Sequence, residues 1–206
     1  MAWRALLDFL FPPQCACCNA IGNGFCDACA PRAERITARF PGLRVRAFGI
    51  YDGPLRSAVL ALKDGRRDVA EALGSRVAPL VEPRSVLVPI PTTSRRLRAR
   101  GLDGVAAVAR CAGGIAGAGV LAVLEQRSGD AQRGRSRAQR LAAMGRFACG
   151  SEVAGRRVTL FDDVCTTGST LCDCAAAVRE AGGIVEDAVV LALTKSGSSW
   201  GIAMNG

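Results

Sequence analysis

The segment 157–178, RVTLFDDVCTTGSTLCDCAAAV, has the composition of a ligand-binding site. An apolar run ends in Asp162 and Asp163, and a loop rich in threonine, serine and glycine follows it. Such a loop at the start of a helix offers hydroxyls, backbone N–H groups and the positive end of the helix dipole, which together bind a phosphate monoester. The loop residues that would do so are Thr166, Thr167, Gly168, Ser169 and Thr170.

The two aspartates would repel that phosphate, so they need a donor-rich partner beside it. A pair of ribose hydroxyls is the natural candidate, and a ribose 5-phosphate satisfies both halves of the segment. The alternative is that the aspartates cap the helix and that the loop is only a turn. Two adjacent carboxylates at the end of a buried strand are unfavourable without a partner, which favours the binding site. A Walker-type nucleotide triphosphatase is excluded, because no G-x-x-x-x-G-K-[ST] loop is present.

Histidine is absent from the chain, so no imidazole can serve as a general base or metal ligand. The net charge is +9, and nearly all of the positive charge is arginine, because Lys63 and Lys195 are the only lysines. The arginines cluster at 95–100 and 133–140. Arginine clusters suit phosphate groups, on a small ligand or along a nucleic acid, although a base composition that favours arginine codons would also enrich them.

Four of the ten cysteines follow the spacing C-x2-C-x7-C-x2-C. In a cytosolic protein this spacing predicts a structural zinc site with four thiolate ligands, namely Cys15, Cys18, Cys26 and Cys29. Asn19 can adopt the left-handed turn that lets backbone amides face the sulfurs. Cys17 lies inside the first pair and is an alternative ligand. Disulfides in a secreted protein are the other interpretation, which the lack of a recognisable signal peptide disfavours.

These groups must be positioned by elements that the hydrophobic pattern predicts. We expect strands over 47–51, 85–90, 119–126, 156–163 and 184–194. We expect helices over 54–64, 68–81, 101–115 and 170–183, with Asp68 as an N-cap. This alternation predicts an α/β fold with a doubly wound, mostly parallel sheet, in which ligands bind at the carboxyl ends of the strands. Residues 31–46 show no clear period and are interpreted as a linker, and 126–150 are unassigned.

Length and composition agree with a folded protein. The 206 residues are half hydrophobic, which suits one domain with a small appendage. We expect the division to be 1–34 for the cysteine module and 47–200 for the α/β domain. No apolar run approaches the roughly 20 residues that cross a bilayer, so we expect no membrane span and a cytoplasmic location.

The motifs together resemble a known family. VTLFDDVCTTGSTL resembles the phosphoribosyl-pyrophosphate motif of type I phosphoribosyltransferases. The segments LLDFLFPPQCACC, YDGPLRSAVLALKDG, VLVPIPTTSRRLRARG and DAQRGRSRAQR…GRF resemble, in order, the blocks of the ComF family of competence-associated, phosphoribosyltransferase-like proteins. Where that family often has R-G-F-N-Q, this chain has RGLDG at 100–104.

The resemblance implies a type I phosphoribosyltransferase-like fold with an N-terminal zinc ribbon. It implies that Asp162 and Asp163 hold the ribose and that 166–170 hold the 5′-phosphate. Arg95, Arg98 and Arg100 would contact the pyrophosphate, with Mg²⁺ bound to pyrophosphate and ribose hydroxyls. The implied activity is phosphoribosyl transfer from phosphoribosyl pyrophosphate to an unidentified acceptor. The alternative is a non-enzymatic DNA-uptake factor that docks a competence helicase or single-stranded DNA, although an aromatic content of 5% leaves few stacking platforms for bases.

Overall fold

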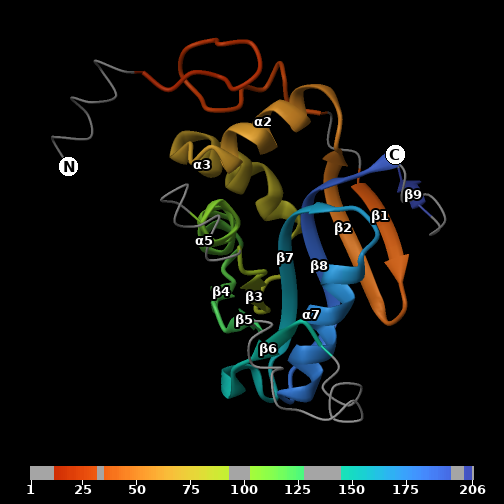
Figure 1. The fold of residues 1–206 in the computed structure, drawn as a ribbon. Helices are drawn as coiled ribbons and strands as arrows, with labels where there is room; N and C mark the ends of the chain where they lie inside the picture. The colour runs from red at the N-terminus through yellow and green to blue at the C-terminus, as the bar shows by residue number, and fades with distance from the viewer. Residues whose placement is uncertain (1–11, 32–34, 93–102, 128–144, 196–201, 206) are drawn as a thin grey trace, which may run out of the picture.

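A seven-stranded sheet forms the centre of the computed structural model, which describes residues 12–31, 35–92, 103–127, 145–195 and 202–205. The strand order is β4-β3-β7-β8-β2-β1-β9, and Figure 1 shows β7 and β8 in the middle. The strands β4, β3, β7, β8 and β2 run parallel, while β1 pairs antiparallel with both β2 and β9. The α/β class and the mostly parallel sheet are therefore confirmed.

The sheet consists of β1 (Arg35–Phe40), β2 (Leu43–Ile50), β3 (Val86–Pro89), β4 (Gly119–Val120), β7 (Arg157–Cys165), β8 (Ile184–Leu193) and β9 (Ile202–Asn205). A separate antiparallel pair is formed by β5 (Leu124–Gln126) and β6 (Phe147–Cys149). The central strands β3, β7 and β8 are buried on both sides because helices cover both faces of the sheet, which explains their nearly continuous apolar sequences.

The four helices of the described residues begin within three residues of the predicted positions. They are α2 (Gly53–Lys63), α3 (Arg67–Val77), α5 (Gly104–Ala116) and α7 (Ser169–Glu180), with short 3₁₀ turns at Ala78–Leu80 and Ser151–Val153. Asp52 caps α2 by accepting the Gly53 N–H, and Asp103 caps α5 by accepting the Ala106 N–H at 3.1 Å. Of these helices, none is long and apolar enough to cross a membrane.

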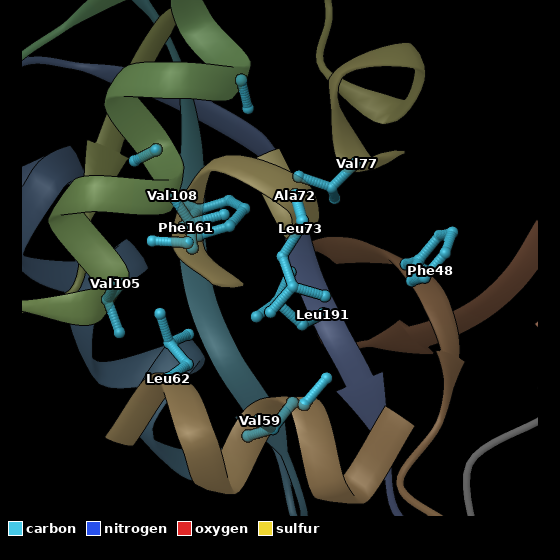
Figure 2. Packing of buried hydrophobic residues seen from close by; sticks show 14 of the residues in the cluster. Phe48, Val59, Leu62, Ala72, Leu73, Val77, Val105, Val108, Phe161 and Leu191 are labelled. Atoms are coloured by element: carbon cyan, nitrogen blue, oxygen red, sulfur yellow. The ribbon is translucent and has the colours of Figure 1, made fainter. Parts of the chain in front are cut away.

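Helices lie on both faces of the sheet, as a doubly wound fold requires. On one face, α2, α3 and α5 pack against side chains such as Phe161 and Leu191, which belong to the same buried cluster as Leu73 and Val108 (Figure 2). On the other face, α7 packs against Leu160 and its neighbours. The apolar side chains of β7 are shared between the two faces, with Leu160 in the α7 layer and Phe161 in the α2–α3–α5 layer.

Residues 12–31 form a cysteine-rich module that packs on α3, above α2 and α3 in Figure 1. Phe25 is completely buried, its carbonyl accepts a hydrogen bond of 2.6 Å from Arg76, and the Arg76 guanidinium lies 5.6 Å from its ring centroid. A Cβ on Gly24 would lie 2.5 Å from the backbone of Asp68, so only glycine allows this approach. The module thus shares the core of the α2–α3–α5 layer.

Three predictions of local structure were wrong. The expected linker over 31–46 contains β1 and the start of β2, because buried residues alternate with polar ones in both strands and Gly42, at φ +66°, makes the turn. Helix α3 begins one residue before Asp68, which pairs with the N-cap residue Arg66 instead of capping. The strand expected over 119–126 divides into β4 and β5, which belong to different sheets.

Candidate functional site

The predicted carboxylates of Asp162 and Asp163 lie near the carboxyl end of β7, which lies between β3 and β8 in the sheet. The strand continues past them to Cys165, two residues beyond the prediction, and Asp162 pairs in register with Val190 of β8. Each aspartate accepts the backbone N–H of the next residue, from Asp163 at 2.8 Å and from Val164 at 2.6 Å. These short local bonds hold both side chains near the strand end.

Charged groups from two other elements surround the aspartate pair. The Lys63 Nζ, at the end of α2, lies 3.1 Å from Asp163 Oδ2. Burial, followed by the negative charges of Asp163 and Asp103, raises the pKa of Asp162 to about 7, although the Asp163 N–H and the Lys63 charge act in the opposite direction. Asp162 is therefore a carboxyl group that changes charge near neutral pH.

The loop between β7 and α7 has the geometry expected of an anion site. Gly168 has φ +74°, and a Cβ at this position would lie 2.3 Å from the ring of Phe40. Glycine is thus required both by the backbone angle and by the contact with β1. Gly168 is the N-cap of α7. Because it has no side chain, it provides no side-chain acceptor for the first backbone N–H groups of the helix.

The hydroxyls of this loop form a small network at the helix start. Thr167 and Ser169 lie within hydrogen-bonding distance at 3.2 Å, and both residues are exposed. Thr166 is exposed and Thr170 is half-buried. The structure therefore gathers hydroxyls and amides of 166–170 at the positive end of α7.

Arg146, just before β6, is a residue of the site that the sequence argument did not assign. Its Nε lies 2.6 Å from Asp173 Oδ2, and its Nη2 lies 3.4 Å from the Ser169 hydroxyl. It belongs to the GRF block at 145–147 that contributed to the family resemblance. That block is the feature of the sequence from which a role for Arg146 could have been predicted. Arg95, Arg98 and Arg100, the predicted pyrophosphate contacts, lie outside the described residues.

The four predicted metal ligands come together. The Sγ atoms of Cys15, Cys18, Cys26 and Cys29 all lie within 4.8 Å of one another. A tetrahedral zinc site with Zn–S bonds of about 2.3 Å has sulfurs about 3.8 Å apart, so this donor set could hold zinc. Cys17 is exposed and is not part of this group.

The backbone around the cysteine cluster supports metal ligation. The N–H groups of Cys17 and Cys26 each point to the Cys15 sulfur at 3.5 Å, and Asn19 adopts φ +59°, as predicted. Burial raises the pKa of the Cys15 thiol, but the backbone N–H groups facing it outweigh burial and bring the pKa down to about 6. The pKa of Cys26 and of Cys29 is raised instead, for Cys29 chiefly by the Cys18 thiol beside it, so metal binding must displace the protons of these thiols.

The other described cysteines are set apart from this group. Burial raises the pKa of the thiols of Cys111, Cys149, Cys165, Cys172 and Cys174. Cys165 and Cys174, on either side of the loop, are fully buried. Their environment suits small apolar packing residues more than nucleophiles.

Curated orotate phosphoribosyltransferases are similar to part of this chain. The protein from Pyrobaculum islandicum is 52% identical over 46 residues, which are 22% of this chain and 24% of that relative. The protein from Nocardioides sp. is 51% identical over 51 residues, which are 25% of this chain and 28% of the relative. The chain thus covers only about a quarter of the length of these relatives.

Two solved structures are similar to part of this chain at low sequence identity. A phosphoribosyltransferase from Corynebacterium diphtheriae is 21% identical, covers 70% of each chain and has a TM-score of 0.41. Glutamine phosphoribosylpyrophosphate amidotransferase from B. subtilis is 22% identical over 60% of this chain and 26% of its own, with a TM-score of 0.45. No family model matches the chain.

Proposed function

We propose that the protein binds the ribose 5-phosphate part of phosphoribosyl pyrophosphate at the carboxyl edge of its sheet and is a phosphoribosyltransferase. The observation that carries this proposal is the combination of two carboxylates at the end of β7 with a glycine-centred, hydroxyl-lined loop at the start of α7. The half-identical segments shared with orotate phosphoribosyltransferases support the same ligand class.

Each half of the site would bind one part of the ligand. Ionised Asp162 and Asp163 accept hydrogen bonds from the ribose hydroxyls, which are the donors that carboxylates need. The amides and hydroxyls of 166–170 bind the 5′-phosphate, and the helix dipole and Arg146 add positive charge beside it. The sugar is thereby held at two points, which fixes the orientation of its anomeric carbon.

The reaction would break the bond between the anomeric carbon and pyrophosphate and form a bond from that carbon to the acceptor. Positive charge develops on the ribose ring as pyrophosphate leaves, so the nearby carboxylates favour this transition state electrostatically. Arg95, Arg98 and Arg100 are the proposed partners of the departing pyrophosphate. Mg²⁺, when bound to pyrophosphate and ribose hydroxyls, would neutralise part of the leaving-group charge. This scheme needs no histidine.

The more specific proposal is a cytoplasmic protein of the ComF type, in which the cysteine cluster holds a structural zinc ion. The acceptor is not identified by any described residue. The alternative role, docking of a competence helicase or single-stranded DNA, depends on arginines at 95–100 and 133–140, which lie outside the described residues. We therefore make DNA binding an outcome of the test.

The test is calorimetric titration with ribose 5-phosphate and with phosphoribosyl pyrophosphate. We expect the wild-type protein to bind both and the Asp162→Ala, Asp163→Ala double variant to lose about a hundredfold or more in affinity, since charge-assisted hydrogen bonds contribute roughly 1.5–3 kcal/mol each. Glu186→Gln removes an exposed carboxylate at the opposite end of β8 and is the matched control.

Unchanged affinity in the double variant would contradict the assignment of the aspartates. If the wild-type protein binds neither sugar phosphate but shifts a labelled single-stranded oligonucleotide with a steep salt dependence, the DNA-uptake role replaces the proposed function.

A further inference from the structure

Lys63 is one of two lysines in the chain, and it ends α2 at the aspartate pair. Its ammonium lies 3.1 Å from Asp163 Oδ2, and the Lys63 and Asp163 side chains are only 30% and 19% exposed. An ion pair partly shielded from water interacts more strongly than one on an open surface. The pair joins the helix layer to the strand that carries the proposed ribose contacts.

We propose that Lys63 is a positioning residue for the ribose half of the site: its ammonium fixes the Asp163 carboxylate and offsets the negative charge that gathers around Asp162. This inference rests on the proposed function, because it assigns a role in binding the ribose hydroxyls. It adds a residue that the strand–loop motif does not contain.

The charges around Asp162 explain why an offsetting cation is needed. Asp163 of β7 and Asp103, the N-cap of α5, both disfavour a negative charge on Asp162, and Lys63 of α2 favours it. The charge of Asp162 also acts on the thiols of Cys165 and Cys174, whose pKa values are raised chiefly by burial, so both stay neutral near pH 7. Among the described charged groups named here, Lys63 is the cation. Its charge counteracts the effect of the Asp163 and Asp103 carboxylates on Asp162.

The consequence for binding follows from hydrogen-bond chemistry. Only an ionised carboxylate can accept hydrogen bonds from both hydroxyls of a ribose diol with both of its oxygens. Since the pKa of Asp162 is about 7, binding of the ribose should strengthen as the pH rises through 7. Removing the Lys63 charge raises that pKa further, so the rise in affinity should move to higher pH.

A simpler role must be distinguished from this one. A lysine in the last turn of a helix stabilises the helix dipole, and the ion pair ties α2 to β7 whatever the ligand. That role would change the stability of the fold, but it would not move the pH at which ribose binds. The pH profile therefore separates the two roles.

The experiment measures ribose 5-phosphate affinity from pH 5.5 to 9 by calorimetry for the wild type and four variants. Lys63→Met keeps the length of the side chain and removes its charge, and Lys63→Arg keeps the charge. Lys195→Met is the matched control, because Lys195 is the other lysine and also forms an ion pair, 2.6 Å from Asp52. Asp103→Asn retains an N-cap residue and removes one of the opposing carboxylates.

We expect Lys63→Met to raise the midpoint of the rise in ribose 5-phosphate affinity by about one pH unit. The affinity should then fall about fivefold at pH 7 and hardly change at pH 9. Lys63→Arg and Lys195→Met should follow the wild type, and Asp103→Asn should move the midpoint in the opposite direction. Inorganic phosphate, which probes the loop without the ribose, should bind all variants equally. A carbon-13 titration of the Asp162 carboxyl in the ligand-free protein should show the same shifts.

Two results would overturn the inference. One is a Lys63→Met profile that coincides with the wild type. The other is an equal loss of ribose 5-phosphate and inorganic phosphate at every pH, which would mean that Lys63 only maintains the fold. If the wild type binds no sugar phosphate at all, both the proposed function and the role of Lys63 in ribose binding are wrong. In that case the carbon-13 midpoints still decide whether Lys63 offsets the charge at Asp162.

Discussion

The cysteine cluster and the carboxyl edge of the sheet both gather acidic ligand atoms, but they are assembled in opposite ways. The four thiols come from residues 15–29, so local turns bring them together. The edge site takes Asp162 and Asp163 from β7, Lys63 from α2 and Asp103 from the start of α5. A local cluster that binds a metal depends on the metal for stability, whereas an edge site depends on the whole fold for its geometry. Changes at the first should therefore affect folding, and changes at the second should mainly affect binding.

The largest effect is expected at the cysteine cluster. Cys26→Ser, or a strong chelator, should remove about one zinc ion per chain and release residues 12–31 from α3, while the sheet stays folded. Structural zinc contributes on the order of several kcal/mol to the folding of small modules, so the buried ring of Phe25 should become exposed when the metal is removed. Elemental analysis and differential scanning calorimetry would measure both effects. Cys17→Ser is the control, and metal-free protein with an unchanged melting profile would contradict the prediction.

A smaller effect on stability is expected at Gly168. Gly168→Ala imposes a left-handed backbone on alanine, which costs about 1–2 kcal/mol, and drives its Cβ into the Phe40 ring, which costs about 1–3 kcal/mol more. It should also weaken inorganic phosphate binding, because the loop must move.

Gly155 provides the matched control for this change. It has φ +68°, and a Cβ there would meet no atom within 4 Å, so Gly155→Ala measures the backbone strain alone. Urea denaturation should give a larger loss for Gly168→Ala than for Gly155→Ala. Equal losses would show that the Phe40 contact does not constrain the loop.

The smallest effect is expected at Arg146, beside the loop. Arg146→Gln should weaken inorganic phosphate and ribose 5-phosphate about tenfold, because one charge-assisted contact is lost. Asp173→Asn breaks the same ion pair but keeps the cation, so it should leave phosphate affinity unchanged or improve it. Similar losses in both variants would mean that the pair only ties β6 to α7, since a structural pair is lost in either case.

The hydrophobic pattern of the sequence was sufficient to predict the strands and the helix around the aspartates and the loop that follows them. The strands β3, β7 and β8 and the helix α7 follow from apolar runs, glycine and helix-start signals within one segment each. The cysteine spacing likewise predicted the cluster, because its ligands are close along the chain. Local rules succeed where the partners of a residue are local.

Other features were missed because their partners are distant. Arg44 and Arg46 gave residues 31–46 a polar composition typical of a linker, but Arg44 makes two hydrogen bonds, of 2.6 and 3.0 Å, with Asp187 of β8. Lys63 and Arg146 were likewise unassigned, since only the packing of α2 and β6 brings them to the site. Nothing in the spacing of these residues indicates such contacts.

The order of strands in the sheet has a consequence for the newly made chain. The hairpin β1–β2 is synthesised early, yet its parallel partner is β8, and Arg44 meets Asp187 across 143 residues. Folding of such long-range pairings is slow, because the intervening chain must be closed into a loop first. Phe40 can support Gly168 only after the C-terminal half has left the ribosome. We therefore expect the loop after β7 to acquire its shape late in folding, whereas the four cysteines of the N-terminal module are synthesised first.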